Sequence, residues 1–390
     1  MDSEKNTRKR IHLCLPHLSG REKDFIDEAL AGSWVVPLGP HVDGFEEDLK
    51  HFLTGSSPEL GGLEIAAVAS GTAALHLALI MLGVTKGDYV ICQSFTFAAS
   101  ANPVVYQGAT PVFIDSEPDT WNMDPELLEK AISELDAQGK RPKAIIPVHL
   151  YGMPAKIDKI CEIASRWEIP VVEDAAEALG STFKGRHCGT FGRFGVLSFN
   201  GNKMITASGG GAVVCPDEAS KKRCIFFATQ AREAAPHYQH EHIGYNYRLS
   251  NVSAAVGRGQ MCILQEHIDR HRHLAALYTE LFKDTEGIEV HLNPSADFES
   301  NYWLSTIIAQ PALTGLTPEK MRSHLASLNI ESRPLWKPMH LQPVYADAPA
   351  YINGVSEKLF DSGLCLPSGP CVSDDDARMI AAEIKSLIRR

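Results

Sequence analysis

Between about residue 64 and residue 216, short apolar runs alternate with stretches of helical periodicity. Most of the runs are continuous rather than alternating, which is typical of strands buried on both faces. The expected strands are Glu64–Ala69, Tyr89–Gln93, Thr110–Asp115, Ala144–Leu150, Pro170–Asp174, Phe194–Phe199 and Gly211–Cys215. The expected helices lie near Thr72–Leu82, Phe97–Tyr106, Pro125–Leu135 and Lys156–Arg166. This alternation predicts an α/β domain with a seven-stranded, mostly parallel sheet and sites at the carboxyl ends of its strands.

A long helical pattern, from about Ser250 to Phe282, leaves this domain, and the alternation changes after it. The later elements indicate a smaller α+β unit, built from Asn301–Ile308, a helix near Pro318–Leu328, the segment Ile330–His340 and a last helix at Asp374–Ile388. A chain of 390 residues is long enough for two domains. We therefore expect a large domain over residues 11–265, with an N-terminal arm, and a small domain over residues 266–390.

Composition narrows the class of protein. The net charge of −11 argues against binding to nucleic acid or to an anionic membrane surface, although a local basic pocket for a phosphate stays compatible with it. No stretch approaches the roughly 18 apolar residues of a membrane helix, and the charged start, Met1–Arg10, is not followed by the apolar core of a signal peptide. Nine scattered cysteines without a Cys-x-x-Cys pair favour reduced thiols in a cytoplasmic protein.

Histidines give no support for a metal site. His267 and His271 have helical spacing but lack the glutamate of a zinc-protease motif. His237, His240 and His242 are expected to belong to a surface loop. Two catalytic patterns are also disfavoured: the chain has no Gly-x-Ser-x-Gly elbow, and the glycines 209–211 precede a strand instead of following one, unlike a dinucleotide fingerprint.

Lys203 and Asp174 each come at the end of an apolar run. A lysine just past a buried strand, among small polar residues, loses solvation and becomes the neutral amine that condenses with an aldehyde to a Schiff base. Alone, a lysine is usually a surface charge, and an aspartate here would cap a turn. Together, an amine and a carboxylate at adjacent strand ends are what pyridoxal phosphate (PLP) requires, because the carboxylate keeps the pyridine nitrogen cationic.

Other candidate contacts lie at neighbouring strand ends. Gly71 and Thr72 open a helix after the first strand, where free N–H groups and a hydroxyl suit a phosphate, to which Ser198 could add a hydroxyl. An ordinary helix cap explains this segment equally well. Phe97 could stack on an aromatic ring, although aromatic residues at such positions more often belong to the core. Glu177, three residues past Asp174, could reach a ring hydroxyl.

Several segments, taken in order, resemble one family. They are Trp34–Pro40 with Phe45-Glu46, Ser70–Leu75, Phe95–Phe97, Val172–Glu177, Ser198–Lys203 and Gly244–Arg248. Over roughly residues 11–388 the chain resembles the DegT/DnrJ/EryC1/StrS family of PLP-dependent sugar aminotransferases, within fold type I (aspartate aminotransferase-like). The resemblance implies that fold and a homodimer with shared active sites.

The resemblance also implies a role for each matching residue. Lys203 would bind the cofactor and move the proton, and Asp174 would pair with the pyridine nitrogen. The further cofactor contacts would be Gly71, Thr72 and Ser198 at the phosphate, Phe97 on the ring, Glu177 at the ring hydroxyl, and Asn246 from the other subunit. Glu177 stands where relatives often have Gln or His. Because Lys203 is retained, the dehydratase chemistry of relatives that carry histidine there is disfavoured.

The segment Arg333–Val344 is similar to that of the subgroup acting on UDP-linked 4-keto-6-deoxy-N-acetyl hexosamines, which make bacillosamine-type 4-amino sugars. A cationic and aromatic loop suits a nucleotide sugar, since guanidinium binds diphosphate and flat side chains bind the base. Pro and Trp are also common in loops that only pack. The expected substrate contacts are Trp34, Arg248, Arg333, Trp336, Lys337 and His340.

The sequence thus predicts transamination of a nucleotide-linked 4-keto-6-deoxy sugar in polysaccharide biosynthesis, with L-glutamate as donor and 2-oxoglutarate as co-product. Two alternatives stay open: a 3-aminotransferase acting on a TDP- or GDP-linked keto sugar, and a non-catalytic regulator or scaffold, which Lys203 and Asp174 disfavour. The sequence does not fix the carbon that is aminated, the nucleotide or the stereochemistry of the new amine.

Overall fold

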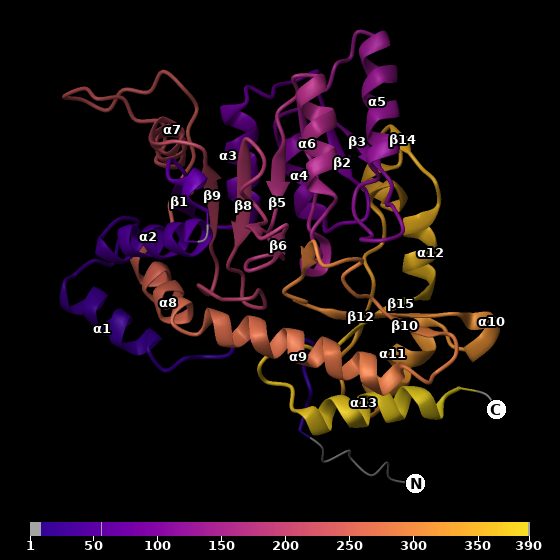
Figure 1. Cartoon of the computed structure of the whole chain (residues 1–390). Helices are drawn as coiled ribbons and strands as arrows, with labels where there is room; N and C mark the ends of the chain where they lie inside the picture. The colour runs from indigo at the N-terminus through magenta and orange to yellow at the C-terminus, as the bar shows by residue number, and fades with distance from the viewer. Residues whose placement is uncertain (1–8, 56, 389–390) are drawn as a thin grey trace.

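The computed structural model describes residues 9–55 and 57–388, so the charged residues 1–8 and the last two residues lie outside the described part of the chain. A central sheet with helices on both faces fills the upper part of the view in Figure 1, and a smaller unit of helices and short strands lies beneath it. The chain therefore has the two-part α/β architecture that its pattern predicts.

The central sheet consists of two ladders, in the orders β1-β9-β8-β5 and β14-β3-β2-β4. Parallel bridges from Ile145 to Val171 and from Val148 to Asp174 join β4 to β5, so the ladders form one sheet. Only β9 runs antiparallel to its neighbours there. The strands are β1 (Glu64–Val68), β2 (Tyr89–Gln93), β3 (Thr110–Ile114), β4 (Ala144–Ile146), β5 (Val172–Asp174), β8 (Phe194–Ser198), β9 (Gly211–Cys215) and β14 (Ala350–Tyr351). All seven predicted strands are present.

Successive residues of each strand point to opposite faces of the sheet, and both faces are covered. On β2, Val90 and Cys92 join the apolar cluster formed with one set of helices, whereas Ile91 joins the cluster formed with the other. The first set is α3 (Gly71–Met81), α4 (Asn102–Tyr106) and α7 (Glu218–Ala228); the second is α5 (Pro125–Ala137) and α6 (Ile157–Arg166). Burial on both faces explains why the strands are continuous apolar runs.

Prolines account for two differences from the predicted bounds. The strand expected over Ala144–Leu150 ends at Ile146, because Pro147 has no N–H for the ladder. The helix expected over Phe97–Tyr106 is a short 3₁₀ turn followed by α4, which starts at Asn102 so that Pro103 falls in the first turn, where a missing N–H costs nothing. The α5 helix begins after Asp124, whose side chain caps it by accepting the N–H groups of Glu126 and Leu127.

The long helical pattern from Ser250 to Phe282 forms two helices instead of one. They are α8 (Asn251–Met261) and α9 (Leu264–Phe282). The break follows two glycines that pack closely: a Cβ on Gly257 would lie 2.7 Å from the Phe45 ring, and a Cβ on Gly259 would lie 2.7 Å from the Glu22 backbone. Those partners belong to α2 (Pro40–Thr54) and α1 (Glu22–Ala31), two helices that the pattern did not predict.

The smaller unit packs helices on an antiparallel sheet of order β10-β12-β15-β13. Its strands are β10 (Ile288–Val290), β12 (Ser305–Ala309), β13 (Arg333–Pro334) and β15 (Gly363–Leu366), and its helices are α9, α10 (Pro311–Thr314), α11 (Pro318–Ser327), α12 (Val355–Ser362) and α13 (Asp374–Ser386). Between β13 and β15 the chain returns to the large sheet, where β14 pairs in parallel with β3. The division at residue 265 stays a prediction.

A third, short sheet of order β11-β6-β7 connects the two units. Its strands are β6 (Thr182–Phe183), β7 (Arg186–His187) and β11 (Phe298–Glu299). Among the helices of residues 9–55 and 57–388, none combines the length and apolar character needed to cross a bilayer.

Candidate active site

A cavity of about 470 Å³ opens where β1, β2, β5 and β8 end, at the edge of the sheet that the strand pattern predicts. Its polar lining comes from four segments of the large unit, and two tryptophans of the later chain complete it. The residues used below are Ser70, Gly71, Thr72, Thr96, Phe97, Ser100, Asp174, Glu177, Ser198, Asn202, Lys203, Trp303 and Trp336. All the predicted cofactor contacts except Asn246 therefore line one cavity.

One end of the cavity is the N-terminus of α3. The Ser70 side chain caps this helix by accepting the Ala73 N–H at 3.0 Å. A Cβ on Gly71 would lie 3.0 Å from Cβ of Ser198, so the start of the helix and the end of β8 are in close contact. Helix N-termini carry N–H groups without an intrahelical partner, and together with the two hydroxyls of Thr72 and Ser198 they form a site for an anion.

Asp174 ends β5 with its carboxylate in the cavity and its side chain almost fully buried. Ser100 Oγ donates to Oδ2 at 2.7 Å, and Ser100 is in turn 2.8 Å from Thr96 Oγ1. The Ala176 N–H donates to Oδ1 at 3.2 Å. These bonds fix the orientation of the carboxylate before any ligand binds.

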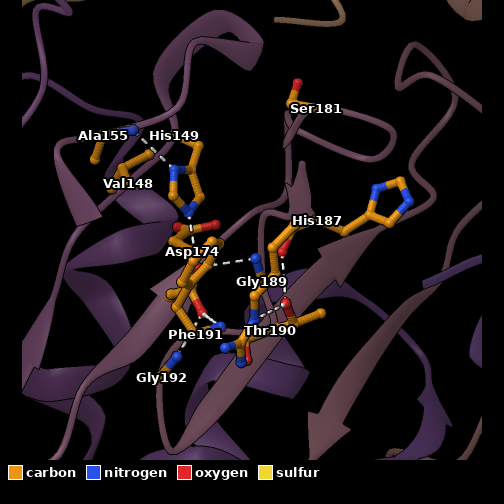
Figure 2. Close-up of polar contacts among 12 residues, drawn as sticks. Val148, His149, Ala155, Asp174, Ser181, His187, Gly189, Thr190, Phe191 and Gly192 are labelled. Atoms are coloured by element: carbon orange, nitrogen blue, oxygen red, sulfur yellow. Dashed lines mark hydrogen bonds and ion pairs between the residues drawn. The ribbon is translucent and has the colours of Figure 1, made fainter. Parts of the chain in front are cut away.

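The neighbouring residue, Glu173, points to the opposite face of β5 and anchors the strand. Its carboxylate, which is fully buried, accepts the N–H groups of Gly189, Phe191 and Gly192 at 2.9, 2.5 and 2.6 Å. Figure 2 shows this loop approaching the strand from the side away from Val148. An ionised carboxylate is tolerated in such a place only because so many donors replace its water.

His149 completes this anchor. Its Nδ1 accepts the Ala155 N–H at 3.0 Å, so Nε2 carries the hydrogen and donates it to Glu173 Oε2 at 3.0 Å (Figure 2). The backbone of His149 also holds Asp174, because its N–H donates to the Asp174 carbonyl at 3.1 Å. Side chain and backbone of one residue thus connect β4 to both acids of β5.

Lys203 lies at the centre of the site. Its Nζ is 3.3 Å from Glu177 Oε1 and 3.9 Å from the centre of the Trp303 ring. Glu177 Oε2 accepts the Tyr151 N–H at 2.7 Å. Burial is the main cause that raises the pKa of Glu177, with a further contribution from Asp174, while the Lys203 charge and the Tyr151 N–H act in the opposite direction.

Aromatic side chains cover the opening. The rings of Phe97 and Trp336 are 5.4 Å apart and tilted, and Trp336 lies nearly parallel to Tyr151 at 6.0 Å. The Trp336 backbone N–H donates to the Tyr151 hydroxyl at 2.8 Å. Phe97 is 55% exposed, so one of its faces is available to a ligand.

Most of the predicted substrate contacts lie away from the cavity lining. Trp34 is 40% exposed on the surface, and Lys337, which directly follows Trp336, is also exposed. Arg333 forms an ion pair with Glu331 at 2.7 Å. Among the predicted substrate contacts, only Trp336 lines the cavity.

Two of the predicted substrate contacts, Arg248 and His340, bind other residues of the protein instead. Arg248 is buried against Glu46, to which its Nη1 donates, and it also donates to the Ala67 carbonyl at 2.8 Å. His340 lies between Ser94 Oγ, 2.6 Å from its Nδ1, and Glu357 Oε1, 3.2 Å from its Nε2.

Asn246 is exposed and outside the lining of its own chain's cavity, on the segment that follows α7. His237, His240 and His242 lie on the same segment and are exposed, as predicted. His267 and His271 are buried in α9, where their Nδ1 atoms lie 3.0 and 3.1 Å from the carbonyls of Met204 and Tyr302.

Four residues of the site were not predicted from the sequence: Ser100, Tyr151, Asn202 and Trp303. Ser100 follows the Phe95–Phe97 segment closely, so its place after β2 was a usable signal. Trp303 gave none, because it lies about 100 residues beyond Lys203 and reaches the cavity only through the packing of the smaller unit.

Comparison with known proteins extends over nearly the whole chain. The sequence profile of the DegT/DnrJ/EryC1/StrS aminotransferase family matches residues 16–385. EpsN of Bacillus subtilis, named for an inferred pyridoxal phosphate-dependent aminotransferase activity, is 49% identical over 94% of this chain and 93% of its own. GDP-perosamine synthase of Escherichia coli O157:H7 is 37% identical over 97% of this chain and 99% of its own. The crystal structure of a DegT DnrJ EryC1 StrS aminotransferase from Brucella abortus superposes with a TM-score of 0.86 at 32% identity, over 95% of this chain and 96% of that one.

The Glu173 anchor makes a prediction about stability. Glu173→Gln keeps the shape but turns an amide NH₂ toward N–H donors, so we expect the free energy of unfolding to fall by about 2–3 kcal/mol. Glu162→Gln is the control, because Glu162 is exposed on α6 and pairs only with Arg166 there, which predicts a change below about 0.5 kcal/mol. Urea unfolding followed by circular dichroism measures both. Equal, small effects would show that Glu173 is not an anchor.

Proposed function

The chain belongs to the DegT/DnrJ/EryC1/StrS aminotransferase family, and we propose that it uses PLP to transfer an amino group from L-glutamate to a nucleotide-linked 4-keto-6-deoxy sugar. The preferred acceptor is UDP-4-keto-6-deoxy-N-acetylglucosamine, and the products are the 4-amino sugar and 2-oxoglutarate, as a step of polysaccharide biosynthesis. The observation that supports this most is a single cavity that holds the Lys203 amine, the Asp174 carboxylate and the N-terminus of α3.

The residues of the cavity fit PLP. The N-terminus of α3, with Thr72 and Ser198, would hold the phosphate. Asp174 would accept a hydrogen bond from the protonated pyridine nitrogen, and Ser100 already orients its carboxylate for this. The exposed face of Phe97 would stack on the ring.

Each of these residues has a definite task in the transfer. PLP, when bound, supplies an electron sink for the bond that breaks at the donor carbon. Lys203 Nζ would bind the cofactor carbonyl carbon and, once displaced by the donor amine, would take the proton from Cα of glutamate and deliver it to that cofactor carbon. Asp174 would keep the ring nitrogen protonated throughout. Trp336 and Tyr151 would exclude water from the opening.

The residues at the cavity opening, Trp336 and Lys337, support a nucleotide sugar as acceptor. The indole N–H of Trp336 is buried and has no hydrogen-bond partner within the described residues, so a sugar, amide or phosphate oxygen would satisfy it. The rings of Phe97 and Trp336, 5.4 Å apart in the cavity lining, offer apolar faces to a base or sugar, and Tyr151 supports Trp336 from behind. Lys337, exposed next to them, adds a positive charge for a diphosphate.

A second candidate acceptor is a GDP-linked keto sugar. The relative named GDP-perosamine synthase is 37% identical over nearly the full length of both chains, and this favours guanine as the alternative base. A TDP-linked keto sugar aminated at carbon 3 is a further alternative.

We also propose a homodimer with shared sites. After α7, residues 230–246 extend away from the body of the protein (Figure 1), and they present Tyr238 and Ile243 with 78% and 82% of their surface exposed. Exposed apolar side chains of this size favour a protein contact. Asn246 at the end of this segment would then reach the phosphate site of the partner. The nine free cysteines support a reducing, cytoplasmic location, which cell fractionation would test.

The cofactor assignment makes the first functional prediction. Protein loaded with PLP should show a visible absorption band of bound cofactor, and L-glutamate should bleach it. Lys203→Ala should lose the covalent link and at least about a hundredfold in rate, since the proton carrier is gone. Lys222→Ala, an exposed lysine of α7 paired with Glu218, should behave like the unchanged protein. Full activity of Lys203→Ala would overturn the assignment.

The acceptor is tested by comparing UDP-, GDP- and TDP-linked 4-keto-6-deoxy sugars as substrates. The enzyme is first treated with L-glutamate, so that its cofactor carries the amino group. We expect kcat/KM for the UDP-linked N-acetyl sugar to exceed the others by at least about tenfold, which corresponds to about 1.4 kcal/mol. Mass and nuclear magnetic resonance spectra of the product identify the aminated carbon. A preference for the GDP sugar would select the second candidate instead.

The shared site predicts complementation between two defective variants. Asn246→Asp should be nearly inactive because its carboxylate would repel the phosphate of the partner site, and Lys203→Ala should be inactive on its own. After unfolding and refolding an equal mixture, half of the dimers should contain one intact site, giving about one quarter of full activity. No recovery, or an active monomer in sedimentation, would contradict the shared site.

A further inference from the structure

Lys203 has two side-chain partners in the cavity, Glu177, which is also a predicted cofactor contact, and Trp303, which is not. Its Nζ lies between Glu177 Oε1 at 3.3 Å and the face of Trp303, 3.9 Å from the ring centre. The side chain of Glu177 is 5% exposed and Trp303 is 2% exposed, against 14% for Lys203. An amine enclosed in this way has a defined resting place inside the protein.

A single buried residue, Asn301, positions both partners. Its Nδ2 donates to the backbone carbonyl of Glu177 at 3.0 Å, and its Oδ1 accepts the N–H of Trp303 at 2.8 Å. Trp303 is fixed a second time through Nε1, which donates to the Asn202 carbonyl at 2.6 Å, one residue before Lys203. Glu177 and Trp303 are therefore held in place around Lys203 by hydrogen bonds that join the two units of the chain.

The charged side chains of the cavity lie close enough for Lys203 and Glu177 to share one proton. Lys203 is the only cationic side chain among the described residues that line it, and it faces two acids, Asp174 and Glu177. Asp174 is bound by Ser100 and by the Ala176 N–H, whereas Glu177 has the Tyr151 N–H on one oxygen and Lys203 on the other. Burial and Asp174 also raise the pKa of Glu177, which increases the affinity of this carboxyl group for a proton.

We propose that Glu177 and Trp303 form a holding site for the free amine of Lys203, in which Glu177 takes the proton from Nζ and later returns it. The inference rests on the proposed function only in that a free, neutral Lys203 is required there. In the transfer one N–H bond of the ammonium breaks and an O–H bond forms at Glu177 Oε1, so that no water or other reactant is needed.

Two opposing physical effects act on the two protonation states of this pair. Turning a buried ion pair into an amine and a carboxylic acid removes two charges from a poorly solvated site. The face of Trp303 opposes this by stabilising the ammonium through a cation–π interaction. The proton therefore stays in the site while it moves between the two groups.

The other titratable groups around the pair stay neutral near pH 7. Burial raises the pKa of Cys14, which faces Lys203, to about 12. Burial likewise raises the pKa of Tyr151 and Cys365, which face Glu177. Within the described residues Asp174 is then the one further charge that acts on the pair.

A shared proton has a signature in cofactor-free protein. Because both states of the pair carry the same number of protons, the fraction of Lys203 in the amine form does not change with pH. Acetylation of Lys203 by acetic anhydride, measured by mass spectrometry from about pH 6 to about pH 9, should thus be nearly independent of pH, while exposed Lys222 gains about tenfold per pH unit in the same molecules.

Two variants sharpen this measurement. Glu177→Gln keeps the shape but accepts no proton, so Lys203 should acquire the tenfold-per-unit dependence of Lys222. Trp303→Phe keeps Glu177 and should keep the flat profile, with acetylation about two- to fivefold faster because the cation–π attraction is weaker. A steep profile for Lys203 in the unchanged protein would overturn the proposal even if neither variant folds. Because no cofactor is present, this result is independent of the absorption test of the aminotransferase activity.

Discussion

The site depends on how β5 carries two adjacent carboxylates to opposite faces of one strand. A strand alternates its side chains, so Glu173 and Asp174 cannot share an environment. Glu173 is fully buried and is satisfied by three backbone N–H groups and by His149, whereas Asp174 faces the cavity. Because burying a carboxylate costs several kcal/mol unless donors replace its water, the position of β5 depends on the loop at residues 189–192 and on His149, which supply these donors. The buried contacts of Glu173 thereby fix the position of Asp174 at the cavity.

The same arrangement determines the charge of the cavity. Since Glu173 makes its hydrogen bonds on the opposite face of β5, the charged residues of the cavity lining are Asp174, Glu177 and Lys203, next to the N-terminus of α3. A cofactor with an anionic phosphate and a protonated ring nitrogen complements this distribution, because the phosphate would lie at the positive end of the helix and the nitrogen would lie at Asp174. The fit to the cofactor thus depends on the positions of the charged groups at the strand ends.

The sequence predicted these strand ends well because their determinants are local. Continuous apolar runs locate β1, β2, β3, β5, β8 and β9 to within a residue or two, and polar residues directly after them become the site. Residues that depend on distant partners were harder. Arg248 matches a family segment, yet its guanidinium pairs with Glu46, more than 200 residues earlier, and no local pattern contains that partner. Trp303 reaches Lys203 only because the smaller unit packs against the large one.

Both units also contribute to the segment that we propose as the contact with the acceptor. The segment that carries Trp336 and Lys337 belongs to the later part of the chain, but the large sheet holds it: the Met339 N–H donates to the Ser94 carbonyl at 2.7 Å, and His340 joins Ser94 to Glu357. Ser94 directly follows β2 and precedes Phe97, so the ring that would stack on the cofactor and the ring that covers the opening are positioned from one strand end. The hydrogen bonds to Ser94 therefore fix the backbone of this segment against the large sheet, and Trp336 extends from it into the cavity lining.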